Sequence, residues 1–443
     1  MKWVFLLGLL VFTPWLTVHL KANPKHLLFA GFAIGILPFL LSGLNLTASP
    51  IAWPYWPGPV KGMDISLIDG VALAVLLSTK RISTPVAIKV SFAIYALAVF
   101  ISTAQSEVKM ASFFYVWQLA RTVLIYMAIA RACVTVKGVP IAVVSGLCAG
   151  LVFQSGVALF EYLGGDLRAG GWFGHQNLLG MASHFGIFPA VALLLAGLYP
   201  IRAFVVVAAG LLIAFTGGSR ATIGLFAIGL VFTWMVSVWH QPSGRKSAIG
   251  FGMVLALAVA APVLWSAVER RTDAERAGSN EMRAEMVDAA AMIISDHPMG
   301  VGPNRYVVVA NTGGYAARAG IAWNPANREA PVHNSYYLVT AEMGWFGLLG
   351  LVSLLCSVVS VSLAAMRKAP AGIEGELLVG VTVSMIIFAI HAYFEWITMF
   401  YNIHYLAGIT VGLIVGLRAL TARKAERLKT RTAASVRSGL AVQ

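Results

Sequence analysis

Long apolar runs constrain this chain more than any other feature of its sequence. Thirteen stretches are apolar for long enough to cross about 30 Å of hydrocarbon. Only 11% of the 443 residues are charged, against about 25% in a typical soluble domain, and the mean hydropathy is +0.80. The sequence therefore predicts an all-α polytopic membrane protein with about 12–13 transmembrane helices. The runs lie at roughly 3–20, 26–48, 63–79, 85–102, 113–131, 138–160, 177–198, 201–217, 219–239, 247–268, 336–364, 374–398 and 402–418.

The runs and the polar segments between them divide the chain into five regions. The first run imitates a secretion signal but lacks a small-x-small cleavage site, so we interpret it as a retained helix. The regions are N-terminal transmembrane helices (1–160), helices with a Gly-rich outer loop (161–268), a large polar loop (269–335), C-terminal transmembrane helices (336–418) and a basic tail (419–443).

The distribution of positive charge predicts which ends of the helices share a side of the membrane. Lys and Arg fall in alternate connections, and the stretch 418–437 holds seven of them against one Glu. Such residues mark the cytoplasmic side and are attracted to anionic lipid, so the net charge of +14 indicates a bilayer partner and no nucleic acid. Thirteen spans would place the N-terminus outside, and an even number would place it inside.

The loop 269–335 is the only sizeable polar region, and it is expected on the outer side. It carries eight acidic residues and seven arginines, but no lysine. A loop of this length between spans is usually functional. Within it, 280–298 predicts an amphipathic helix that Asn280 could cap, and its apolar stripe is Met282, Met286, Ala289, Ala290 and Ile293.

His333 and Asn334 stand where this loop turns abruptly into an apolar helix. A histidine there can accept a proton near neutral pH without a large pKa shift, which makes His333 a candidate general base. The competing interpretation is that both residues only cap the helix and meet lipid headgroups. For a lone histidine at a membrane boundary, that structural interpretation is the commoner outcome.

Three arginines are candidates for binding an anion. Arg220 follows Gly217 and Gly218 between two apolar runs, where an ionisable group is a functional candidate, although it could instead snorkel to lipid phosphate. Arg283 and Arg305 offer the planar fork that grips phosphate, whereas most arginines of the loop are expected to pair with nearby acids.

The Gly-rich segment 165–180 leads into another span. Arg168 and Asn177 would line a polar pocket if this loop folded inward, and Asn177 could equally be an N-cap. The three cysteines lie in or beside apolar runs, so no structural disulfide is expected. There is no CxxC and no HExxH, so the sequence signals no metal site and no cofactor.

Four segments, in order, resemble the bacterial O-antigen ligase and O-antigen polymerase superfamily. "HNSYYLVTAEMGWFGLLGL" resembles its His-Asn signature, and "DHPMGVGPNRYV" its preceding His-Pro-x-Gly-x-Gly turn. "TGGSRATIG" resembles its Thr-x-Ser-Arg span, and "GGWFGHQNLLGMAS" its Gly-x-Phe-x-x-x-Asn segment. The resemblance covers about 165–400. The expected count of thirteen spans departs from the twelve associated with the ligases.

The resemblance implies a metal-independent, inverting glycosyltransferase facing the periplasm in the bacterial inner membrane. The donor would be a glycan on undecaprenyl diphosphate, and the acceptor a hydroxyl of lipid A core or of another glycan. His333 would be the general base, and Arg220 and Arg283 would neutralise the diphosphate. The resemblance also implies supporting roles for Asn334, Tyr336, Arg305 and Glu342. Glu342 would orient a neighbour or pair with an arginine, unless it is only a lone buried acid kept neutral.

Two other classes of protein fit parts of the sequence. A transporter or flippase for lipid-linked glycans predicts inverted repeats, which we do not find. A scaffold without chemistry predicts that the polar residues at the helix mouth affect stability alone. The four segments do not separate a ligase from a polymerase or from a relative that glycosylates proteins.

Overall fold

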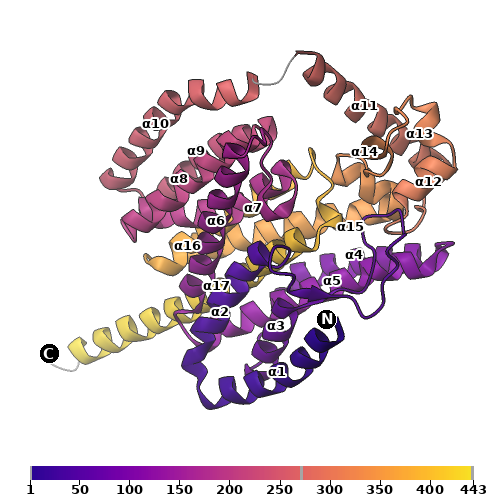
Figure 1. Ribbon diagram of the computed structural model, residues 1–443. Coiled ribbons are helices and arrows are strands. Elements are labelled where there is room, and N and C mark those ends of the chain that lie inside the picture. Colours follow the sequence, from indigo (N-terminus) through magenta and orange to yellow (C-terminus); the bar gives the residue numbers. More distant parts are fainter. Residues whose placement is uncertain (1, 270–272, 441–443) are drawn as a thin grey trace.

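The structure is a bundle of long, apolar α-helices with a small helical cap at one end. It is a computed structural model that describes residues 2–269 and 273–440 (Figure 1). The two short strands β1 (Thr47–Ala48) and β2 (Ile65–Ser66) pair antiparallel. Within the described residues, eleven helices are long and apolar enough to cross a membrane, which confirms an all-α polytopic membrane protein. These helices are α1 (Lys2–Ala22), α4 (Val86–Gln105), α5 (Lys109–Thr135), α6 (Val139–Leu163), α7 (Gln176–Leu195), α8 (Pro200–Gly217), α9 (Arg220–His240), α10 (Gly244–Glu269), α15 (Ser335–Lys368), α16 (Ile373–His391) and α17 (Tyr401–Leu440).

All thirteen apolar runs form helices, but two of them are too short to span. The run 26–48 forms α2 (Leu27–Leu40) after the 3₁₀ turn η1 (Pro24–His26), and the run 63–79 forms α3 (Leu67–Ser78). These helices have 14 and 12 residues, where about 20 are needed. The expected count of thirteen spans is therefore corrected to eleven long helices and two short ones. The other apolar residues of these two runs lie in turns and short strands, which hydropathy does not distinguish from helix.

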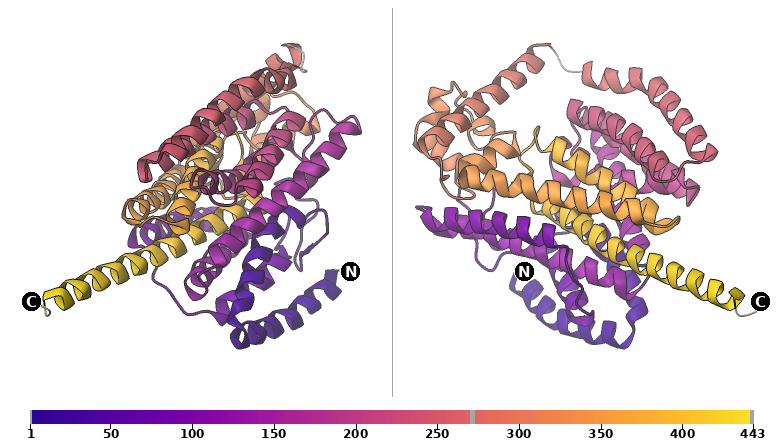
Figure 2. Two further views of the ribbon diagram at one scale, coloured as in Figure 1. Left: turned by 90° about the vertical axis from the view of Figure 1, so that its left-hand side faces the viewer. Right: turned by 180° about the vertical axis from the view of Figure 1, so that it is seen from behind.

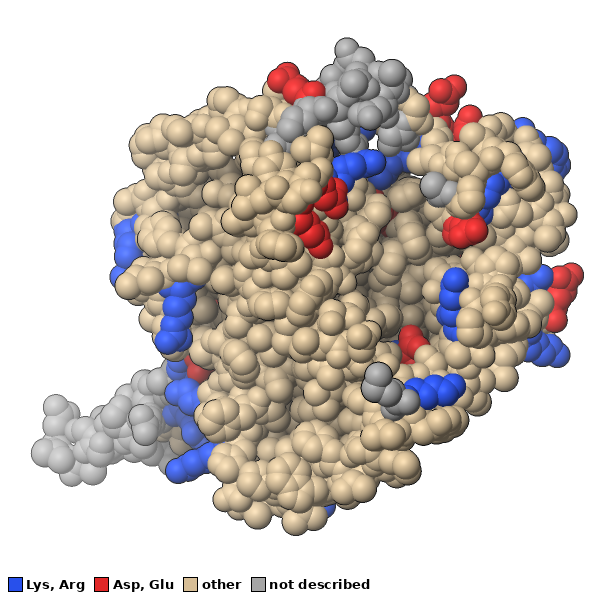
Figure 3. Space-filling view, viewed as in Figure 1, with Lys and Arg blue, Asp and Glu red and all other residues tan. Residues whose placement is uncertain are grey.

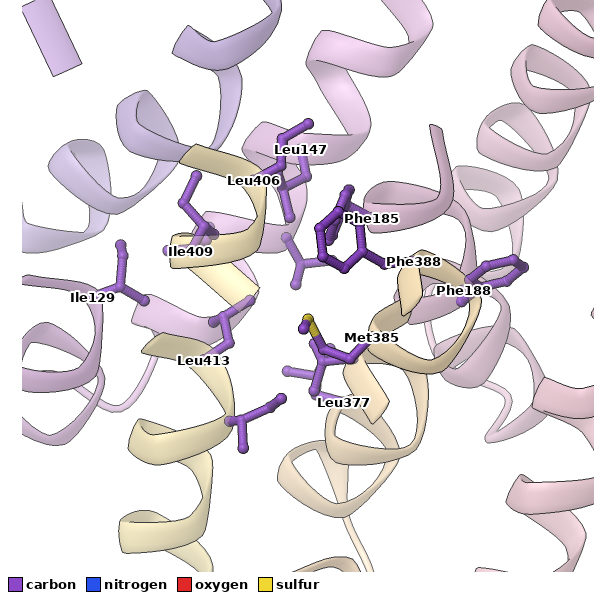
Figure 4. Close-up of a cluster of buried hydrophobic side chains, with 14 of the residues drawn as sticks. Ile129, Leu147, Phe185, Phe188, Leu377, Met385, Phe388, Leu406, Ile409 and Leu413 are labelled. Atoms are coloured by element: carbon purple, nitrogen blue, oxygen red, sulfur yellow. The ribbon is translucent and has the colours of Figure 1, made fainter. Parts of the chain in front are cut away.

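Two hydrophobic cores hold the molecule together. The larger lies in the middle of the bundle, where α5, α6, α7, α16 and α17 interdigitate (Figure 4). Leu147, Phe185, Phe388 and Leu406 are among its fully or nearly buried members. The smaller core lies under the helical cap and is shared with α4, α5 and α15.

The long polar loop forms the cap, whose helices lie together over one end of α15 (Figures 1 and 2). The predicted amphipathic helix is confirmed, and the apolar stripe from Met282 to Ile293 faces the smaller core. Its predicted start at Asn280 is wrong, because the helix already begins at Asp273 and Asn280 lies inside it. The cap helices are α11 (Asp273–Asp296), α12 (Tyr306–Thr312), α13 (Tyr315–Arg318) and α14 (Pro325–Arg328).

The opposite end of the bundle is basic, and we call it the basic end. Arg245 donates to the carbonyl of Ala196 at the end of α7, and Lys246 forms a buried ion pair of 2.7 Å with Glu376 at the start of α16. The helix α17 continues from the last span into the basic tail and ends at Leu440. Between the charged ends, the visible face is largely uncharged, as expected for a surface in contact with lipid (Figure 3).

Candidate active site

A buried carboxylate, Glu395, is the centre of the site at the cap end. It lies in the irregular segment between α16 and α17, next to the 3₁₀ turn η3 (Ile397–Met399). Ser335, the first residue of α15, holds this segment in place. Its hydroxyl donates to the Glu395 carbonyl over 2.5 Å and accepts from the Ile397 amide over 2.8 Å. The start of α15 therefore fixes the backbone of Glu395.

Three side chains from three different helices or loops converge on the Glu395 carboxylate. Oε2 lies 3.2 Å from His333 Nδ1, and Oε1 accepts from Arg283 Nη2 over 3.1 Å and from Asn177 Nδ2. Arg283 also donates to the Phe394 carbonyl over 3.0 Å. The Glu395 side chain is only 1% exposed, whereas that of Arg283 is 31% exposed. Arg283 therefore joins a buried acid to the accessible surface.

The charges around Glu395 keep it ionised. Burial alone would raise its pKa, but the hydrogen bond and charge of His333, together with the charge of Arg283, lower the pKa to about 2. An ionised carboxylate only accepts hydrogen bonds, so His333 Nδ1 carries the proton between them. In the neutral imidazole this leaves Nε2 with a free lone pair, which is the form a general base requires.

The structure separates the roles of His333 and Asn334. Asn334 is the N-cap of α15, and its side chain accepts from the amides of Tyr336 and Tyr337 over 3.0 and 3.2 Å. His333 makes no such cap: its ring binds Glu395 and lies edge-to-face against Trp396. Asn334 is thus structural, and His333 is held by a charged partner.

Asn177 also departs from a simple capping role. The N-cap of α7 is His175, whose Nδ1 accepts from the Asn177 amide over 3.3 Å. Burial is the main cause that lowers the pKa of His175, which favours the neutral ring that can accept this hydrogen bond. The side chain of Asn177 is thereby free to donate to Glu395. Arg168, in contrast, is exposed, and its only hydrogen bond in the described structure runs from its backbone amide to Asp166.

Arg220 joins the site through the cap. It is the first residue of α9 and follows the left-handed Gly218, which ends α8, and the N-cap Ser219, so the predicted helix break is confirmed. Its Nη2 donates to Asn280 Oδ1 of α11 over 2.8 Å. Asn280 lies three residues before Arg283, on the same side of α11. Asn280 therefore joins the exposed Arg220 to the side of α11 that carries the half-exposed Arg283.

Arg305 and Glu342 belong to a second cluster. Arg305 is buried and forms an ion pair of 2.6 Å with Glu107, and Glu342 Oε1 accepts from the Tyr306 amide at the start of α12. No hydrogen bond or ion pair between described residues connects either of them to Glu395. Sequence reasoning grouped Arg305 with the other anion-binding arginines, and the structure does not bring it to them.

The second cluster fixes the shape of α15 below His333. The amides of Val301 and Gly302 donate to the carbonyls of Ala341 and Glu342, and α15 kinks at Gly344, where φ is 68°. A Cβ on Gly344 would lie 2.5 Å from the Pro298 carbonyl oxygen. The backbone of the Gly-rich turn at 298–302 thus packs directly against the backbone of α15, the helix that His333 precedes. Tyr336 adds a hydrogen bond of 2.7 Å to the Ala389 carbonyl of α16.

Two further arginines of the cap are engaged locally, but of these only Arg318 pairs with an acidic residue, as the sequence predicted; Arg328 contacts carbonyls and an aromatic ring instead. Arg318 lies 3.9 Å from Asp296 and over the ring of Tyr315. Arg328 donates to the Ile321 carbonyl and lies over Trp323. Among the described residues, no group of three or more His, Cys, Asp or Glu side chains is arranged to hold a metal ion.

Sequence reasoning missed Glu395, the residue that organises the site. It was assigned to an apolar span at 374–398, but α16 ends at His391 and the following residues form the irregular segment. The available signal was an acidic residue within a membrane-grade apolar run, which is rare and commonly functional. A single acidic residue between Phe394 and Trp396 was not enough to interrupt the run by hydropathy alone.

Fold and site together define a multi-pass α-helical membrane protein with a polar, charge-rich site where the bundle meets its cap. Residues 204–352 match the family model described as O-Antigen ligase. This match covers about a third of the chain, and the matched segment is therefore similar to O-antigen ligases. No curated protein matches the chain. The matched range includes Arg220, Arg283 and His333, whereas Asn177 and Glu395 lie outside it.

Proposed function

We propose that the protein is an O-antigen ligase-like glycosyltransferase that moves a glycan from a polyprenyl-diphosphate carrier to an acceptor hydroxyl. The observation that carries the proposal is the bridging of His333 and Arg283 by one buried carboxylate. In such a transfer the base contacts the acceptor hydroxyl and the cation contacts the leaving group. The base and the cation must therefore lie within about the width of one sugar ring of each other. Glu395 sets this distance by holding both side chains.

His333 Nε2 accepts the proton of the acceptor hydroxyl as its oxygen attacks the anomeric carbon of the donor. The new bond forms between that carbon and the acceptor oxygen, while the bond to the diphosphate oxygen breaks with its electron pair. Attack opposite the leaving group inverts the anomeric configuration. Glu395 stays ionised and stabilises the imidazolium that forms.

Arg283 and Arg220 neutralise the charge that develops on the diphosphate. Each guanidinium retains N–H groups beyond the one or two engaged in the structure, and a planar fork suits phosphate oxygens. Preorganised cations stabilise the leaving group without reorganisation during the reaction. No cofactor or metal is invoked in this scheme. Arg305 is not assigned this role, because its side chain is buried in the second cluster, where it pairs with Glu107, and is not joined to Glu395.

An apolar cavity of about 240 Å³ beside the site supports a lipid-linked donor. It lies between α4, α5, α15, α16 and α17, and its lining includes Ala392, Ile397 and Thr398 of the segment that carries Glu395. A polyprenyl chain could occupy this space while its diphosphate meets the arginines at the bundle mouth. The expected placement of this mouth at the periplasmic face of a bacterial inner membrane agrees with the basic opposite end.

Complementation tests the proposal against its alternatives. In cells lacking the native gene, His333→Ala and Arg283→Ala variants that insert normally should fail to restore glycan transfer, whereas Arg318→Ala should restore it. Full transfer by both site variants would refute the proposal. Flux of a labelled lipid-linked glycan in proteoliposomes, without covalent transfer, would instead support a transporter.

The same deletion distinguishes a ligase from a polymerase. Loss of all long-chain glycan from lipid A core, with carrier-linked polymer accumulating, indicates a ligase. Retention of a single-repeat product indicates a polymerase, and unchanged lipopolysaccharide with an unmodified protein substrate indicates a protein glycosyltransferase. We favour the ligase.

A further inference from the structure

A second cavity, of about 650 Å³, opens on the outside of the bundle, far from Glu395. It lies between α2, α6, α7 and α8, and we call it the α6–α8 groove. Val144, Ala190 and Val206 form part of its buried floor, and Phe32 and Phe153 stand half-exposed at its rim. Almost all of its lining is apolar, so the groove suits a hydrocarbon chain better than a water-soluble ligand.

The length of the groove matches one leaflet of a bilayer. Along α6 its lining extends from Ile141, two residues into the helix, to Phe153, near its middle. Twelve residues of α-helix rise about 18 Å, and half of a typical hydrocarbon core is about 15 Å. The groove therefore begins at the basic end of the bundle and stops near the middle of the membrane.

Arg202 and Tyr199 close the groove at its basic end. The Arg202 guanidinium is exposed and lies over the Tyr199 ring, 5.3 Å from its centroid, which holds the planar group in a defined orientation. Arg245 lies beside the same loop, because its side chain donates to Ala196 and a Cβ on Gly197 would lie 2.4 Å from its Nη1. Among the described residues, no carboxylate forms an ion pair with either arginine.

We propose that the α6–α8 groove binds an anionic phospholipid of the leaflet at the basic end. One acyl chain lies in the groove, and the phosphate meets Arg202, with Arg245 as a second cation. Two arginines without acidic partners, placed where an acyl chain in the groove would end in its headgroup, select an anionic lipid over a zwitterionic one. This site is independent of the proposed glycan transfer, since Glu395 and His333 lie at the other end of α7.

Native mass spectrometry of the full-length protein tests the proposal with phosphatidylglycerol and phosphatidylcholine of identical acyl chains. The wild type should retain phosphatidylglycerol preferentially. Arg202→Gln should weaken its binding about fivefold, the factor equivalent to about 1 kcal/mol for one basic residue near the headgroups. Arg81→Gln, which changes an exposed arginine of the α3–α4 connection, is the matched control and should bind as the wild type does.

Ala149→Phe tests the acyl-chain part of the same site, because Ala149 lines the groove and a larger side chain would fill it. This variant should lose both phospholipids, while its thermal unfolding in detergent stays close to that of the wild type. Unchanged phosphatidylglycerol binding in Arg202→Gln, or in Ala149→Phe, would overturn the proposal. Displacement of phosphatidylglycerol by equimolar polyprenyl phosphate would overturn the choice of a phospholipid as the occupant.

Discussion

His333 Nδ1 and Glu395 Oε2 lie 3.2 Å apart, although 62 residues separate them in the chain. Two transmembrane helices, α15 and α16, carry the chain away from the site and back between these two residues. The contact depends on how the start of α15 meets the segment after α16, which Ser335 secures through its hydrogen bonds to Glu395 and Ile397. This charge pair therefore forms only in the folded bundle, and no local sequence pattern predicts it.

Replacing Glu395 with glutamine should prevent His333 from acting as a base, although residue 395 keeps its hydrogen bonds to Asn177, Arg283 and His333. Asn177 and Arg283 both donate to Oε1, so the amide oxygen must take that position and the NH₂ group must face His333. The imidazole would then accept at Nδ1 and carry its proton on Nε2, the tautomer that cannot accept from the acceptor hydroxyl. We expect kcat to fall by about 10²–10⁴, with a smaller change in the KM for the donor.

Glu374→Gln is the matched control for that variant, because it removes a carboxylate at the other end of the bundle, near Lys424. It should leave the rate of glycan transfer unchanged. Steady-state kinetics with a purified lipid-linked donor measure both variants. A Glu395→Gln enzyme with a normal kcat would show that His333 does not depend on this carboxylate.

Arg283→Ala should lower glycan transfer by about 10²-fold, the usual order for losing one donor that stabilises a developing anion. Arg283→Lys should recover only part of the loss, because an ammonium supplies charge without the planar fork. Arg318→Ala is the control from the same cap, where the arginine only pairs with Asp296 and Tyr315. Wild-type kinetics for Arg283→Lys would argue against bidentate recognition of phosphate.

Because of the ion pairs of Glu395, the free energy of unfolding should decrease as the pH falls into the acidic range. Folding lowers its pKa from 4.5 to about 2, so the stabilisation is complete above about pH 5.5 and is lost as the pH falls towards 2. The shift corresponds to a contribution on the order of 3 kcal/mol. Chemical unfolding in detergent, from pH 7 down to pH 3, should show the wild type losing its advantage over Glu395→Gln. A constant difference between them over this range would contradict the assignment.

Gly344→Ala should destabilise the protein by about 2 kcal/mol or more. The backbone there has φ of 68°, which disfavours any Cβ, and the added atom would lie 2.5 Å from the Pro298 carbonyl oxygen. Gly156→Ala in α6 is the matched control, because a Cβ there meets nothing within 4 Å. Thermal unfolding should separate the two variants clearly. Similar unfolding temperatures would show that the Gly-rich turn does not depend on the kink in α15.

The helices could be predicted from the sequence because a helix within a membrane requires a continuous run of apolar residues. All thirteen apolar runs became helices, and the apolar stripe from Met282 to Ile293 faces the core as its spacing predicted. The predicted helix boundaries were wrong where a turn lies within an apolar run or where a helix extends into polar sequence. The runs 26–48 and 374–398 include turns that hydropathy does not register, and Asn280 lies inside α11 because residues before it continue the helix.

The site was predictable only in its parts. His333, Arg283 and Asn177 were selected from the sequence, and the structure brings them to one carboxylate. The sequence could not pair them, because the pairing depends on the tertiary packing of α7, α11 and α15 around the end of α16. The same lack of tertiary information grouped Arg305 with the anion-binding residues, although it belongs with Glu107.

Single-turnover glycan transfer by His333→Ala tests the central claim most directly. The measurement uses purified full-length protein, a lipid-linked donor at saturating concentration and a purified acceptor, so that donor affinity and insertion into cell membranes do not affect the rate. Our account predicts a rate at least about 10²-fold below that of the wild type, with donor binding retained through Arg283. A folded His333→Ala protein that transfers glycan at the wild-type rate would contradict it.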